Sequence, residues 1–255
     1  MFNLFTADLQ RIFRGKAVYI IGLLIFIFPI LHKVQGSSGG PVFAPIDGLT
    51  GGYFSTFHLM FLVENMLFLV PLILSMVIGD DYKAGTMKNI IGSGFSRSKY
   101  YLSKLFVAWF IKMLYFSIQV FGAMIFSTIV HGFGQTFTMD VLVNILRPFG
   151  IIALVYLAIL AIAMFIFNLF KNENIFSIVF ITIFFAPNLI IMMLSTRVAW
   201  LTRLTDFELI RNIRMIIPYN TLYVGNYSFV TLLALGFILA SGMIGLVFFQ
   251  KGEVK

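Results

Sequence analysis

The sequence DDYKAGTMKNIIGSGFSRSKYYLSK, residues 80–104, decides how this chain folds. It is the longest strongly polar interval in an otherwise apolar sequence, and it holds five of the 18 Lys and Arg residues. Apolar segments long enough to cross a bilayer as helices lie on both sides of it. We therefore predict that residues 79–104 form a cytosolic loop between two membrane-spanning helices.

The composition of the 255-residue chain is typical of a polytopic membrane protein. Hydrophobic residues make up 60% and charged residues 11%, with a mean hydropathy of +0.99, whereas soluble domains carry about 25% charged residues. The chain has no cysteine, which excludes disulfide and thiol chemistry. The net charge of +8 lies beside apolar segments, so we attribute it to orientation in an anionic membrane and not to nucleic-acid binding.

Six apolar segments predict an all-α fold with six transmembrane helices in a single domain, residues 1–255. The segments cover about residues 16–32, 57–78, 105–130, 149–170, 175–194 and 228–249. Each is close to the roughly 20 residues that a helix needs to cross a bilayer. With both termini inside, the inner segments hold eleven Lys and Arg and the outer segments six, which favours an N-in, C-in topology. Four arginines between the fifth and sixth segments weaken this bias.

Amphipathic patterns predict further helices outside the spans. Residues 1–15 have an apolar face, with Asp8, Arg11 and Arg14 elsewhere on the helical wheel, which indicates an interfacial helix and not a cleaved signal peptide. Residues 205–217 have a Thr205–Glu208 capping box and an apolar face that includes Leu209, Ile213 and Ile216. A weaker outer helix is expected at 139–146. The outer helices serve either as interfacial anchors or as a lid over an exit path.

Within the polar loop, the glycines indicate a short helix. Gly85-Thr86 offers an N-cap, residues 87–91 form one turn or slightly more, and Gly92 and Gly94 terminate it. Ser96 then caps a second helix that leads into the third span. Lys88 and Asn89 are expected to point outward, with Ile90 and Ile91 available for burial. Taken alone, the pattern fits a turn between spans as well as a surface for a soluble partner.

The loop resembles a motif of the ABC-2 type transporter permeases. The shared residues are Asp81, Gly85, Thr86, Lys88, Asn89, Gly94, Ser96, Arg97, Tyr101, Leu102 and Lys104. The resemblance implies that the short helix is a coupling helix that docks into a separate ATPase subunit. The coupling residues would then be Gly85, Thr86, Met87, Lys88, Asn89, Ile90, Ile91 and Arg97. Peptide and lantibiotic exporters, including those of phenol-soluble modulins, are similar in size and in their phenylalanine-rich composition.

The chemistry of ATP hydrolysis is missing from the chain. No G-x-x-x-x-G-K-[ST] motif occurs, and the glycine-rich residues 92–99 lack the Gly-Lys pair that cradles phosphates. No paired carboxylates or Ser/His/Asp set lie at matched membrane depth. We therefore expect a non-enzymatic chain that binds no cofactor directly, with ATP and magnesium held by the partner.

A few polar and small residues lie inside the predicted spans. Glu64 is the one acid, and it either contacts cationic substrate groups in the path or bonds to a neighbouring helix. Lys112 is expected to extend its stem toward the cytosol. Pro29, Pro71 and Pro187 are expected to kink their helices. The sixth span carries two small-residue pairs for close packing, Gly236 with Ala240 and Ser241 with Gly245.

The sequence therefore favours a permease subunit of a bacterial plasma-membrane ABC exporter. Its expected partners are two ATPase subunits, a second permease subunit, membrane lipid and a hydrophobic or peptide substrate. The alternatives are an ion- or proton-coupled carrier that acts alone, and a non-transporting immunity or scaffold protein. Against the carrier, the chain shows no convincing internal repeat and few intramembrane charges.

Overall fold

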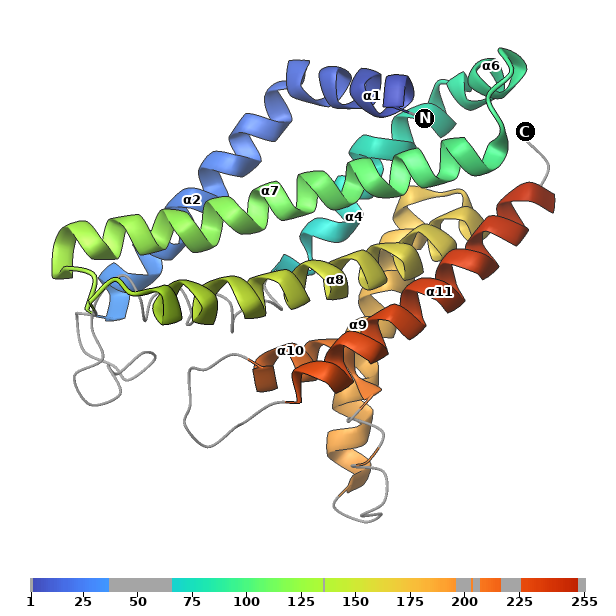
Figure 1. Cartoon of the computed structure of the whole chain (residues 1–255). Helices are drawn as coiled ribbons and strands as arrows, with labels where there is room; N and C mark the ends of the chain where they lie inside the picture. The colour runs from blue at the N-terminus through green and yellow to red at the C-terminus, as the bar shows by residue number, and fades with distance from the viewer. Residues whose placement is uncertain are drawn as a thin grey trace.

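The computed structural model describes residues 2–36, 66–134, 136–195, 203, 207–216 and 226–251, and this part of the chain is a set of helices without strands (Figure 1). The helices are α1 (Phe2–Arg14), α2 (Lys16–Gly36), α4 (Leu69–Leu74), the π-helix η2 (Ser75–Gly79), α5 (Asp80–Lys83), α6 (Thr86–Gly92), α7 (Arg97–His131), α8 (Met139–Phe170), α9 (Glu173–Ser195), α10 (Leu209–Ile216) and α11 (Tyr227–Lys251).

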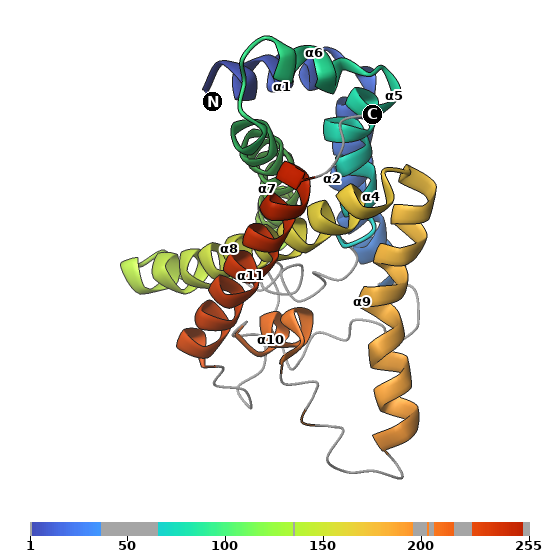
Figure 2. The same cartoon turned by 90° about the vertical axis from the view of Figure 1, so that its right-hand side faces the viewer.

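Three of the described helices are long and apolar enough to cross a membrane: α7 over Arg97–Ile129, α8 and α11. Shorter apolar helical stretches cover 16–27 in α2 and 173–186 in α9. Helix α11 packs along α8, and α7 packs against α1, α2 and α8. These helices confirm the prediction of an all-α membrane protein. Figures 1 and 2 place α1, α6 and the C-terminal end of α11 at the same end of the molecule.

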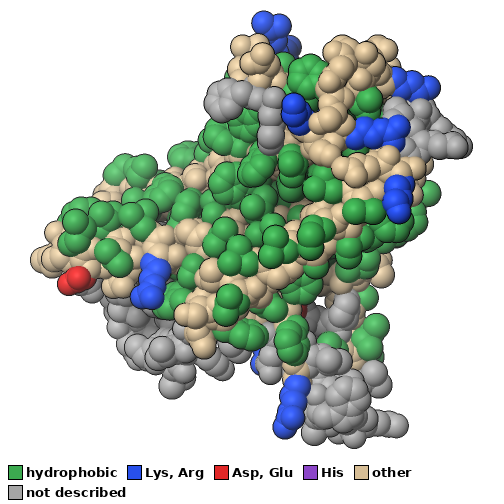
Figure 3. All heavy atoms as spheres, turned by 45° about the vertical axis from the view of Figure 1, so that its right-hand side comes forward, with side chains coloured by type: hydrophobic (Ala, Val, Ile, Leu, Met, Phe, Trp, Pro, Cys, Tyr) green, Lys and Arg blue, Asp and Glu red, His purple; other side chains and the backbone are tan. Residues whose placement is uncertain are grey.

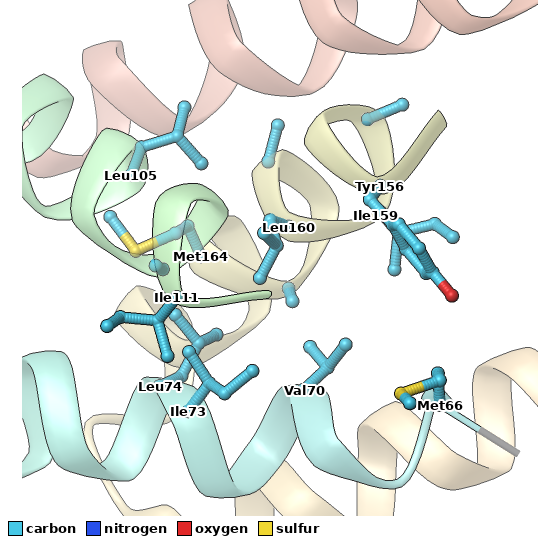
Figure 4. Close-up of a cluster of buried hydrophobic side chains, with 14 of the residues drawn as sticks. Met66, Val70, Ile73, Leu74, Leu105, Ile111, Tyr156, Ile159, Leu160 and Met164 are labelled. Atoms are coloured by element: carbon cyan, nitrogen blue, oxygen red, sulfur yellow. The ribbon is translucent and has the colours of Figure 1, made fainter. Parts of the chain in front are cut away.

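The core lies where α4 meets α7 and α8 (Figure 4). Val70, Ile73 and Leu74 of α4 are fully buried, and they face Ile111 of α7 and Leu160 of α8. The outer surface is apolar as well, as the space-filling view in Figure 3 shows. Leu23, Ile178 and Leu232 are 58%, 67% and 68% exposed. A surface of this kind is suited to lipid, which needs no polar side chains to cover the helices.

Helix α8 is continuous where the sequence indicated two elements. The expected outer helix at 139–146 and the apolar segment at 149–170 form one helix, with Pro148 inside it. Val141, Ile145, Pro148 and Ile152 are all buried, so one apolar stripe at helical spacing runs straight past the proline. Packing of that stripe compensates for the hydrogen bond that the proline ring removes.

The helix before the polar loop changes its winding near its end. Pro71 lies in the first turn of α4, where a missing N–H leaves no helical hydrogen bond broken. The helix then passes through η2, where the Asp80 N–H bonds five residues back to the Ser75 carbonyl, and continues into α5. Periodicity of apolar residues does not reveal such a local change in winding.

Two other helices differ from expectation in their bounds. Helix α2 extends to Gly36, past the predicted end near residue 32. Helix α10 begins at Leu209, four residues after the predicted N-cap Thr205, which lies outside the described residues. The predicted apolar face of α10 is present, since Leu209, Ile213 and Ile216 are buried.

Candidate functional site

Helix α6 is the short helix that the polar loop predicted, and it begins and ends at left-handed glycines. Gly85 has a φ of 64° and Gly94 a φ of 96°, a region that glycine adopts without steric cost. Of the two residues expected to offer the N-cap, Gly85 and Thr86, only the first takes that position. Gly85 occupies the N-cap position, and the Thr86 hydroxyl donates to Asp81 Oδ1 at 3.2 Å. Thr86 therefore links α6 to α5 and does not cap its own helix.

The faces of α6 differ in exposure. Met87 is 4% exposed and anchors the helix in the protein, while Ile90 and Ile91 are half-buried against the core. Lys88 and Asn89 are exposed, as the sequence predicted. Figures 1 and 2 show α6 and α1 at the same end of the molecule. The helix is thus held through Met87 and presents a polar face outward.

The start of α7 is joined to the end of α11. Ser96 Oγ accepts a hydrogen bond from the Lys99 N–H, which confirms the predicted cap. Arg97 Nη1 donates to the Gln250 carbonyl at 2.6 Å, and Gln250 Nε2 donates to Ser98 Oγ at 2.7 Å. Arg97 therefore reaches a carbonyl of the last turn of α11, where a cation is also favoured by the helix dipole.

A buried group of charges connects α6 to the rest of the molecule, and Asp81 lies at its centre. Lys104 Nζ of α7 is 2.5 Å from Asp81 Oδ2, and Arg11 Nη1 of α1 is 2.5 Å from Asp81 Oδ1. The Tyr100 hydroxyl donates to Asp81 Oδ2 at 2.7 Å. With the bond from Thr86, one carboxylate joins α1, α5, α6 and α7.

A second acid, Asp8 of α1, completes the charge balance. Its Oδ1 lies 2.7 Å from Lys104 Nζ and 3.6 Å from Arg11 Nη2. Two carboxylates and two cations therefore share the site. We call Asp8, Arg11, Asp81 and Lys104 the charge cluster. Lys104 is fully buried, and Asp81 and Asp8 are 1% and 5% exposed. A buried group of ions is tolerated when the charges pair and hydrogen bonds satisfy their remaining atoms.

The placement of Asp8 corrects the expectation for α1. The helical wheel placed Asp8 away from the apolar face, and the structure buries it against α7. Asp81 and Lys104 are part of the sequence motif, which does not by itself assign a role to either residue. The available signal was the spacing of Asp8 and Arg11, which puts both on one face of a helix. It could not indicate that the face meets α5 and α7.

The charge cluster shifts the pKa values of its two acids in opposite directions. Burial alone would raise the pKa of Asp81, but the Lys104 ammonium and the hydrogen bonds from Lys104, Tyr100 and Arg11 outweigh it and hold that pKa below its usual 3.8. Burial raises the pKa of Asp8, because Lys104 and Arg11 offset only part of its desolvation. Asp81 is thus the firmly ionised acid of the pair.

A further contact ties α5 to the turn between α8 and α9. Lys83 Nζ lies 2.8 Å from Glu173 Oε2, and the Tyr82 hydroxyl donates to Asn168 Oδ1 at 3.0 Å. Burial raises the pKa of Tyr82 to about 12. Tyr82, Lys83 and Glu173 line an open cleft of about 500 Å³ with Gly79, Phe167, Lys171, Asn172 and Asn174. Because the Cβ of an alanine at Gly79 would lie 1.8 Å from Glu173 Oε1, the contact requires glycine there.

The intramembrane lysine behaves differently from expectation. Lys112 is fully buried, donates to the Met66 carbonyl and lies 4.4 Å from the centre of the Tyr156 ring. Its ammonium is therefore bound inside the protein, whereas the stem was expected to extend toward a membrane surface. Glu64, the proposed contact for cargo, lies outside the described residues.

Comparison with known protein families identifies the family of this chain. The model of the ABC-2 family transporter proteins matches residues 4–188, which include most of α1, the charge cluster, α6 and most of α9. No curated protein matches the chain. Because the matched region covers well over half of the sequence, the chain belongs to the ABC-2 family of transporter proteins, as a membrane-embedded permease component of an ABC transporter.

Proposed function

We propose that this chain is the permease subunit of an ATP-driven exporter, and that α6 is the helix through which an ATPase subunit acts on it. Support comes from the two sides of α6. Lys88 and Asn89 are exposed for a partner, while Thr86 bonds to Asp81 at the centre of the charge cluster. A push on α6 would therefore reach α1 and α7 directly through side chains as well as along the backbone.

The proposed architecture has six spans with both termini in the cytosol. The cytosolic end then carries α1, α6 and the C-terminal end of α11, which lie at one end of the molecule (Figure 1). Two such permeases, identical or related, would enclose the path, and two ATPase subunits would each hold one α6. ATP and magnesium would bind only in those partners, since the chain has no phosphate-binding motif.

The proposed cargo is hydrophobic or amphipathic, such as a peptide, and is exported across a bacterial plasma membrane. The described spans offer little polar lining, which supports an apolar cargo. Of the charged side chains in these segments, Lys112 is already engaged with the Met66 carbonyl and the Tyr156 ring. Glu64 remains the candidate for contact with cationic groups of the cargo.

The test is assembly with a candidate ATPase subunit in proteoliposomes. Lys88→Glu, and Ile90→Ser with Ile91→Ser, should weaken copurification and reduce ATP-dependent export at least tenfold. Arg203→Glu serves as the control, because Arg203 is exposed and lies outside α6. Unchanged association and export in the α6 variants would overturn the role of α6. Transport driven by an ion gradient without any ATPase would overturn the exporter itself.

A further inference from the structure

The π-helix η2 lies between the apolar helix α4 and the polar loop, where a change of winding has the largest effect on the loop. It covers Ser75–Gly79 and continues without interruption into α5. A π-helical turn closes one residue later than an α-helical turn. Every residue after it is therefore rotated around the helix axis relative to a regular α-helix.

One arginine from another helix contacts both this turn and the residue that follows it. Arg11 Nη2 donates to the Val77 carbonyl at 3.1 Å and to the Met76 carbonyl at 3.4 Å. The other nitrogen of the same guanidinium, Nη1, donates to Asp81. Arg11 thus holds two carbonyls inside η2 and the carboxylate just beyond it at the same time.

The other partners of Asp81 fix the angle at which α5 leaves η2. Lys104 and Tyr100 of α7 bind its Oδ2, and Thr86 binds its Oδ1 together with Arg11. The neighbouring Asp80 is exposed, so the two acids lie on opposite sides of the boundary between protein and solvent. A shift of register would exchange a buried, fully bonded carboxylate for an exposed one.

We propose that Arg11 is a positioning residue that holds η2 in its π-helical register and thereby sets the orientation of α5 and α6. Return of η2 to an α-helical register turns α5 by about 100° and moves it by about 1.5 Å, the increments of one helical residue. That turn withdraws Asp81 from Lys104 and rotates the segment that carries α6. The inference deepens the proposed function, since it makes α1 the element that controls where α6 is presented.

The chemistry of the contact requires arginine and not merely a positive charge. A planar guanidinium has several donors in fixed directions, and it can bind a carboxylate and backbone carbonyls together. A lysine ammonium retains the charge but not this geometry. We call the hold of Arg11 on η2 and Asp81 the register lock. Arg11→Lys keeps the net charge of the cluster but removes the geometry of the guanidinium, so it tests the register lock separately from the charge.

The experiment measures the register in the purified permease, without any ATPase. Because the chain has no cysteine, paired cysteines at Ala84, next to α5, and Met243, on α11, take two spin labels and no others. Both positions are exposed. A turn of about 100° on a helix about 10 Å across displaces the label at residue 84 by roughly 5 Å or more. Electron–electron resonance reports that displacement as a shifted or second distance population.

Arg11→Gln and Arg11→Lys should both produce the second population, and Asp81→Asn should produce it as well. Arg14→Gln and Arg14→Lys are the matched controls, because Arg14 is an exposed arginine of the same helix. They should keep the single wild-type distance. A wild-type distribution in all the Arg11 and Asp81 variants would overturn the register lock. So would an equal change in the Arg14 variants.

The spin-label distances and the ATPase-binding test fail in different ways, so the register lock and the role of α6 are tested separately. If the register shifts in the Arg11 variants but Lys88 variants still bind the ATPase and export, then the lock stands and the role of α6 falls. If Lys88 variants lose the ATPase while the distances never change, the role of α6 stands and the lock falls.

Discussion

Asp81 and Lys104 meet at 2.5 Å, with the side chains 1% and 0% exposed, although 22 residues including a complete helix separate them in the chain. The pair connects Asp81, near the start of the polar loop, to the helix that follows the loop. The loop is therefore closed on itself through a buried ion pair, and α6 lies between its two ends. Five predictions follow from the charge cluster and from two close contacts at glycines.

Asp81→Asn should destabilise the protein by about 3 kcal/mol, the lower end of the cost of breaking a buried ion pair, because Asp8 still compensates Lys104. Asp80→Asn, which changes an exposed acid of the same helix, should stay within about 0.5 kcal/mol. The measurement is the midpoint of thermal unfolding in detergent, followed by tryptophan fluorescence. Trp109 is a suitable reporter, since its indole bonds to the Ala153 carbonyl between α7 and α8. Equal midpoints for the two variants would contradict the prediction.

The higher unfolding midpoint of wild type relative to Asp81→Asn should be lost only at acid pH. The native pKa of Asp81 lies below its usual 3.8, so the unfolded chain takes up the proton first as the pH falls. The stabilisation is complete above pH 3.8 and is lost as the pH falls through the lower native pKa. The unfolding midpoints of the two proteins should therefore converge only at strongly acidic pH. Convergence already near neutral pH would show that Asp81 is not held ionised.

Asp8 should show the opposite dependence. Its native pKa is raised, so the native protein takes up the proton before the unfolded chain does. Its contribution to the free energy of unfolding is full below pH 3.8 and is lost as the pH rises through the native pKa. The difference in midpoint between wild type and Asp8→Asn should therefore move in favour of wild type as the pH is lowered toward 4. A difference that moves the other way would contradict the assignment.

Gly79→Ala should destabilise the protein by about 1–3 kcal/mol, the usual cost of overpacking. The new Cβ would lie 1.8 Å from Glu173 Oε1 and 2.7 Å from its Cδ, so Glu173 must leave Lys83. In the Glu173→Ala background the same substitution should cost far less. Gly150→Ala is the control, because nothing lies within 4 Å of a Cβ there. Additive effects of Gly79→Ala and Glu173→Ala would argue against the contact.

Gly245→Ala and Gly236→Ala should show which of the two small-residue pairs of α11 is tightly packed. A Cβ at Gly245 would lie 2.3 Å from the Tyr101 hydroxyl, whereas one at Gly236 would meet nothing within 4 Å. We expect a loss of about 1–3 kcal/mol for Gly245→Ala and little change for Gly236→Ala. Tyr101→Phe should relieve the first variant, since that hydroxyl is buried without a hydrogen-bond partner among the described residues. Failure of the double variant to recover the unfolding midpoint would contradict this packing.

The sequence by itself determined the class of the protein and the place of its candidate site. Long apolar segments with few charges permit only membrane helices, because lipid cannot satisfy an open backbone. Glycines before and after residues 86–91 determined a short helix, since only glycine adopts the left-handed turns there at no cost. Ser96 determined the start of α7 by capping its first turn. Each of these signals acts within a few residues, so local patterns are sufficient to reveal it.

Only the tertiary structure decided which polar residues work together. Asp8 belongs to an apparently polar face of α1 until α7 and α5 pack against it, and then it is buried beside Lys104. Pro148 looks like a break between two helices until a continuous buried stripe carries α8 past it. The π-helical register of η2 depends on Arg11 from a helix more than sixty residues away. Contacts of this kind arise from packing between distant segments, and the pattern of any one segment does not contain them.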